Sequence, residues 1–175
     1  MACSSVTLAG IALGCKDNMG GIELVHLSLH ENVASKTLTS NVITAITMAE
    51  ISSGVFAKFQ TYRLRRESSS LTSTYNTDEA AGSASFTNDL ALQFSKMETS
   101  KRIEIQALAQ DELDAIVKDR NGKYWYIERV TASAGTAVSG QAAADLNGYT
   151  LTLSSVSAEL PVEVDADAVA SVIAA

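Results

Sequence analysis

The sequence has little of what would cross-link a protein or attract polyanions. Two cysteines in 175 residues, Cys3 and Cys15, are too few for a disulfide framework, and neither lies in a CxxC or Cys/His pattern of zinc spacing. They predict free thiols in a reducing compartment. The 13 Lys and Arg are outnumbered by 20 Asp and Glu, so the net charge is −7. Such a balance argues against tight binding to nucleic-acid phosphates.

Aromatic residues make up only 6% of the chain, and Pro161 is the single proline. Ser and Thr together form about a fifth of it, a bias that favours a β-rich structural module with long polar faces. The length predicts one domain over 1–175 with one core. We expect an N-terminal arm over 1–14 and a C-terminal tail over 160–175.

No apolar run reaches the roughly 18 residues that span a bilayer. The apolar stretch before Cys15 loosely resembles a lipoprotein cleavage box, but no Lys or Arg precedes Lys16, where a signal peptide needs positive charge. We therefore favour a first strand or flexible arm over 6–13, with lipidation at Cys15 as the alternative.

Alternation of apolar and polar residues predicts most of the strands. It indicates a half-buried strand over 22–29, a short strand over 40–48, a core-facing strand over 84–94 and a last strand over 149–156. Asn121-Gly122 predicts a type I′ hairpin over 115–127, and 97–113 is typical of an amphipathic helix. The Ala/Ser/Gly/Thr-rich stretch 131–147 indicates a mobile loop.

The pattern as a whole predicts an α+β fold, an antiparallel β-sandwich or barrel of about seven strands with one flanking α-helix. Within it, 55–66 and 68–77 alternate as two long strands that are polar on both faces. They predict a hairpin that overhangs the core, since neither face has enough apolar surface to be covered. Such a hairpin would need a partner surface.

No motif for catalysis or cofactor binding stands out. His26 and His30 are the only histidines, and on a strand their spacing separates them by roughly 13 Å, too far for one metal ion. No GxSxG elbow, GxGxxG or Walker pattern is present. We expect no enzyme activity, no metal site and no cofactor.

Two clusters suggest binding. The basic group Lys58, Arg63, Arg65 and Arg66 beside Tyr62 could contact nucleic acid, but the net charge favours an intersubunit salt-bridge strip opposite acidic patches. Trp125 with its neighbouring tyrosines could form a sugar platform, but aromatic residues beside a hairpin turn more often pack across strands.

Three stretches carry a resemblance to a known family: IALGCKDNMGGIELV near the start, FTNDLALQFSKMETSKRIEIQALAQDELDAIVKDRNGKYWYI in the middle and DLNGYTLTLSSVSAELPVEV near the end. Together they resemble the tail tube proteins of tailed phages that infect Bacteroidales. The likeness spans 11–164, and the stretch between Glu31 and Ser85 carries none of it.

The resemblance implies a β-barrel or sandwich with a flanking helix that forms hexameric rings, stacked head to tail into a hollow tube for DNA ejection. It implies a virion protein, assembled in the host bacterial cytoplasm, with tape-measure and tail terminator or baseplate proteins as partners and no membrane. Lys58, Tyr62, Arg63, Arg65 and Arg66 would lie at subunit contacts, and small polar or acidic residues would line the lumen. The alternatives are the inner tube of a contractile injection system and a secreted binding lipoprotein.

Overall fold

The computed structural model describes residues 10–11, 16–78, 80, 82–142 and 144–174. Of the N-terminal arm expected over 1–14, only residues 10 and 11 are in this range, and both cysteines lie outside it. In chain order the elements are β1 (Ile22–Leu29), a 3-10 turn (His30–Asn32), β2 (Val33–Thr39), β3 (Val42–Met48), β4 (Glu50–Ser52), β5 (Val55–Phe56), β6 (Gln60–Arg63), β7 (Ser70–Asp78), β8 (Ser83–Ser95), α1 (Thr99–Leu108), β9 (Leu113–Asp119), β10 (Tyr124–Val138), β11 (Gly148–Ser157), β12 (Val162–Val164) and α2 (Ala166–Val172).

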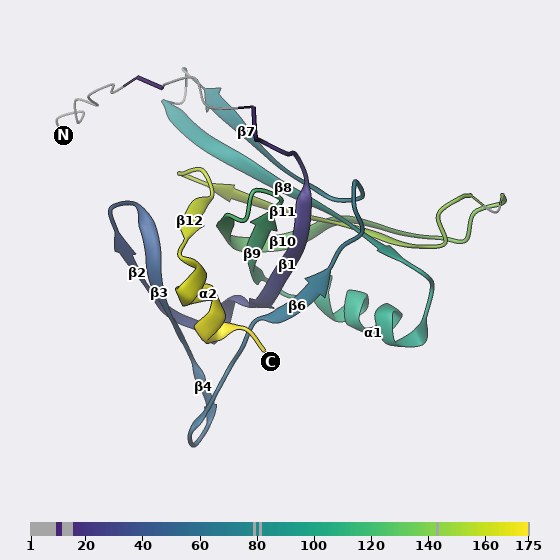
Figure 1. Ribbon diagram of the computed structural model, residues 1–175, viewed down its shortest axis with the longest axis horizontal. Coiled ribbons are helices and arrows are strands. Elements are labelled where there is room, and N and C mark those ends of the chain that lie inside the picture. Colours follow the sequence, from purple (N-terminus) through teal and green to yellow (C-terminus); the bar gives the residue numbers. More distant parts are fainter. Residues whose placement is uncertain (1–9, 12–15, 79, 81, 143, 175) are drawn as a thin grey trace.

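Apart from β4 and β5, which pair only with each other among the described strands, the strands form two sheets that share β10 (Figure 1). Sheet I has the order β7-β8-β11-β10, where β10 contributes residues 131–138. Sheet II has the order β6-β1-β9-β10-β12-β3-β2, where β10 contributes residues 124–130. All pairings are antiparallel except that of β12 with β3. The predicted fold class is confirmed: the chain is an α+β protein with a curled, mostly antiparallel half-barrel and a flanking helix.

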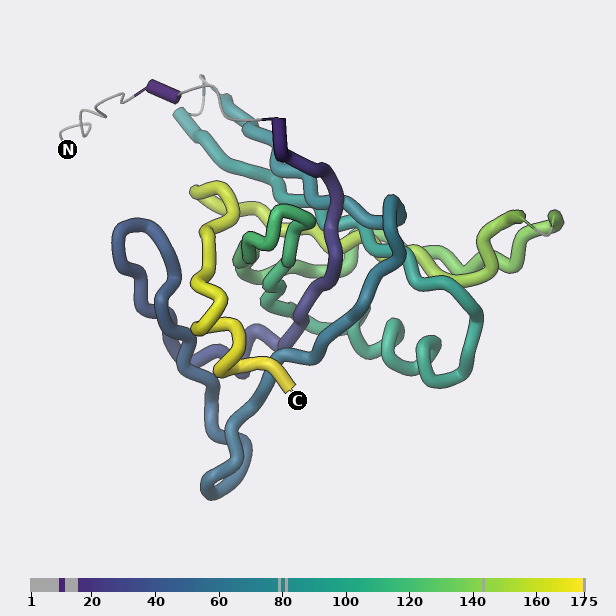
Figure 2. The backbone as a smooth tube through the Cα atoms, in the orientation of Figure 1, coloured from purple at the N-terminus to yellow at the C-terminus, as the bar shows by residue number. Residues whose placement is uncertain are grey.

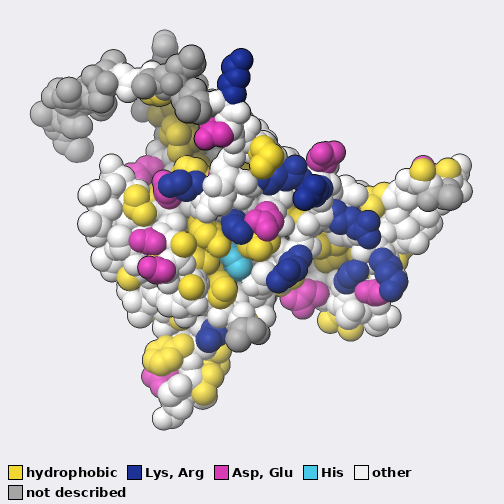
Figure 3. All heavy atoms as spheres, viewed as in Figure 1, with side chains coloured by type: hydrophobic (Ala, Val, Ile, Leu, Met, Phe, Trp, Pro, Cys, Tyr) yellow, Lys and Arg dark blue, Asp and Glu magenta, His cyan; other side chains and the backbone are white. Residues whose placement is uncertain are grey.

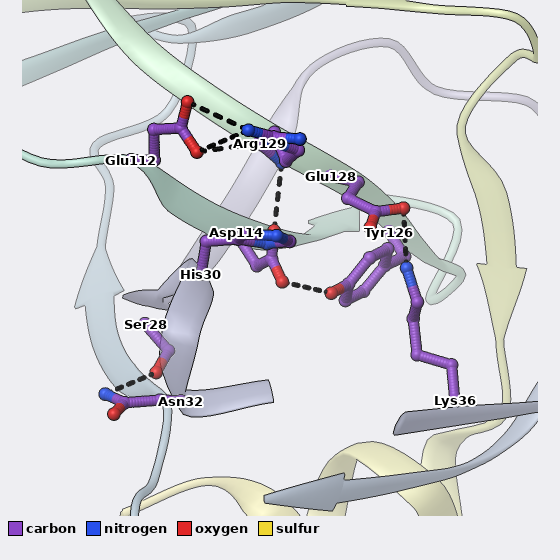
Figure 4. Close-up of polar contacts among 9 residues, drawn as sticks. All are labelled: Ser28, His30, Asn32, Lys36, Glu112, Asp114, Tyr126, Glu128 and Arg129. Carbon is purple, nitrogen blue, oxygen red and sulfur yellow. Dashed lines mark hydrogen bonds and ion pairs between the residues drawn. The ribbon is translucent and has the colours of Figure 1, made fainter. Parts of the chain in front are cut away.

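A bulge turns β10 from one sheet to the other. The register of β10 against β9 shifts between Ile127 and Val130. Within this bulge Arg129 has a φ of 53°, a conformation that is costly for a residue with a side chain. Its backbone N–H donates to a carboxylate oxygen of the buried Asp114 at 2.9 Å. The buried carboxylate thus stabilises the corner at which the sheet folds over (Figure 4).

Two apolar clusters lie on the two sides of sheet II. The first fills the space between the sheets and includes Val25, Leu27, Leu90 and Leu153. The second packs α2 and Phe59 against β3, β9 and β12. Because β1 lies between these clusters, it is buried on both faces from Val25 to Ser28, although Glu23 is exposed. The strand expected to be half-buried at 22–29 is therefore buried on both faces over its second half.

Most of the predicted elements are confirmed, with changes at their ends. The strands expected at 22–29, 40–48, 68–77, 84–94 and 149–156 are present as β1, β3, β7, β8 and β11, and the expected helix is the shorter α1. Strand β2 was not predicted.

The hairpin at Asn121-Gly122 is present, but its turn is of another type. Gly122 has a φ of 83° and donates its N–H to the Asp119 carbonyl at 3.2 Å, whereas Asn121 keeps a negative φ. This geometry is a type I turn followed by a glycine bulge. Positive φ at two successive residues, the mark of a type I′ turn, occurs instead at Ser40 and Asn41 between β2 and β3.

Three predictions are wrong. Residues 131–138 are not a mobile loop but extend β10, because a strand edge needs only backbone partners and small side chains do not prevent pairing. The C-terminal tail expected over 160–175 instead contains β12 and α2, whose Val169 and Val172 are buried. The long strand expected over 55–66 breaks after β5, because Ala57 and Phe59 enter the second apolar cluster.

The overhanging hairpin expected over 55–77 therefore does not form. Strand β6 pairs with β1, and β7 pairs with β8, so the two strands belong to different sheets. What projects instead are the β4–β5 hairpin, the β7–β8 hairpin and the β10–β11 hairpin, which point away from the core in different directions (Figure 2).

Candidate assembly interface

The outward face of sheet I is a broad polar surface, here called the polar wall. Strand alternation assigns its residues, since Leu90, Leu92, Leu151 and Leu153 on the same strands point into the core. The polar wall consists of Ser70, Thr72, Thr74, Asn76 and Asp78 of β7, Ser83, Ser85, Thr87, Asp89, Ala91 and Gln93 of β8, Thr150, Thr152, Ser154 and Val156 of β11, and Thr131, Ala134, Thr136 and Val138 of β10.

Charge on the polar wall has one sign. Asp78 and Asp89 are its two ionisable residues, and these positions include no Lys or Arg. Cross-strand hydrogen bonds hold the short side chains: the Thr136 and Thr150 hydroxyls lie 2.6 Å apart, and the Asn76 amide donates to the Thr87 hydroxyl at 2.7 Å. The Ser154 hydroxyl also donates to the Asp89 carboxylate. The wall is thus polar, mostly uncharged and locally ordered.

Both edges of sheet I are free within the described part of the chain. Strand β7 pairs on one side with β8, and no described strand pairs with its other side. Residues 131–138 of β10 pair only with β11 among the described residues, and nearly all of them are exposed. Free edges of this length are templates for pairing with another chain.

A third surface is the β4–β5 hairpin, which projects from the core on its own (Figure 1). All of its residues are exposed, including Ile51 at 68%, Val55 at 53% and Phe56 at 55%. An isolated two-stranded hairpin is only marginally stable in water. Apolar side chains along its two arms, visible as a hydrophobic patch in Figure 3, indicate a contact surface.

The five residues expected at subunit contacts do not form one strip along a strand: Tyr62 and Arg63 belong to β6, whereas Lys58 precedes this strand and Arg65 and Arg66 follow it. Tyr62 is half-buried on β6, and its hydroxyl donates to Glu104 of α1 at 2.5 Å. Burial, reinforced by this carboxylate, raises the pKa of the Tyr62 phenol well above its usual range. Its role is to hold α1 to sheet II.

The remaining four residues of that group, Lys58, Arg63, Arg65 and Arg66, are exposed. None of the four forms an ion pair within the described part of the chain. Lys and Arg side chains are prominent over β6 and α1 on the face shown in Figure 3. None of the four lies on the polar wall.

The histidines and the aromatic cluster have structural contacts. The His26 ring lies 2.9 Å from the Thr61 hydroxyl, and burial, followed by the charge of Lys118, lowers the pKa of His26 to about 4. Trp125 donates its indole N–H to Asp119, and Tyr124 stacks on His26. Among the described residues, no group of three or more His, Cys, Asp or Glu is placed to hold a metal ion.

Sequence reasoning missed the polar network centred on Asp114, drawn in Figure 4. Asp114 is fully buried and accepts hydrogen bonds from the Tyr126 hydroxyl at 2.5 Å and the Arg129 N–H at 2.9 Å. His30 Nδ1 lies 2.9 Å from the same carboxylate. One signal could have revealed it: a lone carboxylate in the otherwise apolar run LeuAspAlaIleVal must be paired if the strand is buried.

No family model matches the chain, and no curated protein or solved structure is significantly similar to it. The resemblance to tail tube proteins is therefore a basis for proposals alone. Among the described residues, no helix is both long and apolar enough to cross a membrane.

Proposed function

We propose that the chain is a structural protein whose copies form rings that stack head to tail into a tube, the conduit through which a phage ejects its DNA. The observation that carries this proposal is the polar wall, a four-stranded face without a Lys or Arg, on a sheet whose two edges pair with no other described strand. In the proposed ring the wall faces the lumen.

The strand directions in sheet I permit a closed ring. Neighbouring strands alternate in direction across β7, β8, β11 and β10, so β7 and the end of β10 run in opposite directions. A second copy can therefore add its β7 to the free edge of β10 as one more antiparallel strand. Repetition of this contact continues the sheet, and closure removes every free edge of sheet I.

The resulting bore would pass duplex DNA. Six copies, the number that the family resemblance implies, would contribute 6 × 4 = 24 strands from sheet I. With strands about 4.8 Å apart and tilted by about 40°, the barrel would be roughly 48 Å across between backbones. Side chains on both walls would leave roughly 35 to 40 Å.

The chemistry of the wall suits a conduit. Each Lys or Arg that contacts a phosphate releases counterions and strengthens binding, which would slow the passage of DNA. Short hydroxyl and amide side chains, with Asp78 and Asp89, offer no such contact. Lys58, Arg63, Arg65 and Arg66, which form no ion pair within the described part of the chain, could meet carboxylates of neighbouring subunits or rings, and the exposed β4–β5 hairpin could contact the next ring.

Negative-stain microscopy and a mobility-shift assay test the function. Purified protein should form rings or tubes, and isolated tubes should not retain duplex DNA at physiological salt. A variant with a cation on the wall, Thr152→Lys, should assemble equally well but retain DNA in a salt-sensitive way.

The matched control places the same cation outside the wall, at the exposed Thr47 on β3 (Thr47→Lys). It should behave like the wild type. A wild-type protein that forms no ring or tube at high concentration, or that binds DNA at sub-micromolar concentration through Lys58, Arg63, Arg65 or Arg66, would contradict the proposal.

A further inference from the structure

Strand β7 ends sheet I with an aromatic side chain, Tyr75, that is more than half exposed. Tyr75 lies on the core-side face of β7, opposite Phe86 of β8, and the two ring centroids are 5.1 Å apart. The row continues through Phe86 to Ser157 of β11, but on the other side of Tyr75 the sheet stops. Tyr75 is 56% exposed. Exposed tyrosines at a free edge are favourable anchors for a protein contact.

The opposite edge of sheet I has an open groove. It lies between α1 and residues 132–137 of β10 and has a volume of about 490 Å³. Small residues of β10, such as Gly135 and Ala137, form one side, and Ile105 of α1 lies on the other. Leu108 is the one fully buried residue of α1, so the helix flanks the groove without closing it.

Tyr75 and the groove lie on the same face of sheet I. Gly135 and Ala137 pair with Leu151 and Tyr149, which point away from the polar wall, as Tyr75 does. Residues opposite each other in an antiparallel pair share a face, and this holds across a subunit border as well. When β7 of one copy pairs with β10 of the next, Tyr75 must therefore point into the space beside the next copy's α1.

We propose that the α1–β10 groove is the docking site for Tyr75 of a second copy of this chain. The inference rests on the proposed function, since it specifies the contact that joins neighbours in the ring. The ring of Tyr75 would pack on Gly135, Ala137 and Ile105. Its hydroxyl could hydrogen-bond to Arg102 or Gln106, whose polar side chains also line the groove. The contact is heterologous, because each copy gives a tyrosine at one edge and a groove at the other.

A mixing experiment with two variants tests the contact. Tyr75→Glu removes the anchor but keeps the groove, and Ala137→Trp fills the groove but keeps the anchor. Because both residues are exposed, each variant should fold, which circular dichroism and the melting temperature verify. Each variant alone should need a roughly 10- to 100-fold higher concentration than the wild type to assemble. An equimolar mixture should give a 1:1 dimer in sedimentation velocity, because one intact contact remains and no ring can close.

Two controls isolate the side chain and its face. Tyr75→Phe keeps the aromatic ring and should assemble within a few-fold of the wild type. Thr74→Glu adds the same charge at the preceding residue of β7, which lies on the polar wall, and this variant should assemble like the wild type.

The outcomes separate this inference from the proposed function. If Tyr75→Glu forms rings at the wild-type concentration, or if the mixture stays monomeric while the wild type forms rings, the docking site is wrong and the function stands. If the mixture gives the dimer but the wild type forms neither rings nor tubes, the contact is right and the proposed function fails. A wild type that stays monomeric at every concentration overturns both.

Discussion

Removal of the Asp114 carboxylate should be among the most costly single changes in this protein. In Asp114→Ala the hydroxyl of the buried Tyr126 and the Arg129 N–H lose the fully buried carboxylate that accepts from both. A buried donor left without a partner costs about 1 to 3 kcal/mol. His30 adds less, because 32% of its side chain is exposed and can bind water instead. The free energy of unfolding should therefore fall by about 3 to 5 kcal/mol.

Two further variants divide this effect. Tyr126→Phe removes one donor and keeps the carboxylate, so we expect a loss of about 1 to 2 kcal/mol. Glu112→Ala removes the exposed ion pair with Arg129 at 3.1 Å, beside the same bulge, and should cost less than about 0.5 kcal/mol.

Urea unfolding at pH 7, at concentrations low enough to keep the chain monomeric, measures all three differences. The denaturant dependence should be the same for every variant, so that midpoints report stability alone. If Asp114→Ala unfolds within about 1 kcal/mol of the wild type, or no more easily than Glu112→Ala, the carboxylate does not hold the corner of β10, and the reasoning fails.

Three other perturbations probe the fold. Gly148→Ala would place a Cβ 2.0 Å from the Phe94 carbonyl oxygen and should lower the unfolding free energy by about 2 to 4 kcal/mol, whereas Gly135→Ala meets backbone only at 3.5 Å and should be nearly neutral in the same urea assay. Gly122→Val must adopt a φ of 83° and should cost about 1 to 3 kcal/mol; an unchanged melting temperature would show that the turn does not need glycine. The pKa of His26 falls to about 4 on folding, so the unfolded chain binds more protons than the folded chain between pH 6.5 and 4, and the free energy of unfolding should decrease as the pH falls through this window. In His26→Gln this decrease, measured by unfolding curves at several pH values, should be smaller. An identical decrease in both proteins would contradict the role given to His26.

Local patterns in the sequence predict the strands well where one apolar face meets the core. The alternation at 84–94 and 149–156 identifies β8 and β11, because their leucines point inward and most of their polar residues outward. The exceptions are Asn88 and Ser155, which are buried on the inward face and hydrogen-bonded to each other. The same alternation predicted two strands at 55–66 and 68–77, but the prediction that they pair with each other is wrong. Pairing is decided by distant segments: β6 is taken up by β1, and the break before it follows from the burial of Phe59 against α2.

The sequence likewise predicted some properties of the candidate assembly interface but not the residues that form it. Composition alone indicated long faces of Ser and Thr and a shortage of cations, which are properties of the polar wall. The particular cations named from the sequence, Lys58, Arg63, Arg65 and Arg66, lie away from it, and the edge residue Tyr75 went unnoticed. An edge strand cannot be recognised from its own sequence, because it shows the same alternation of apolar and polar residues as a strand that is paired on both sides.

The sequence by itself determined the class of fold and the acidic, polar character of the surface, because these depend on side-chain type and short-range periodicity. The one core expected from the length is instead two apolar clusters on the two sides of sheet II. Only the tertiary structure decided that β10 serves two sheets, that Asp114 holds its corner, and that residues 162–172 complete the second apolar cluster. These features depend on contacts between residues far apart in the chain. Each such contact is selected by the burial and hydrogen bonding of the whole molecule, so no window of neighbouring residues contains the information.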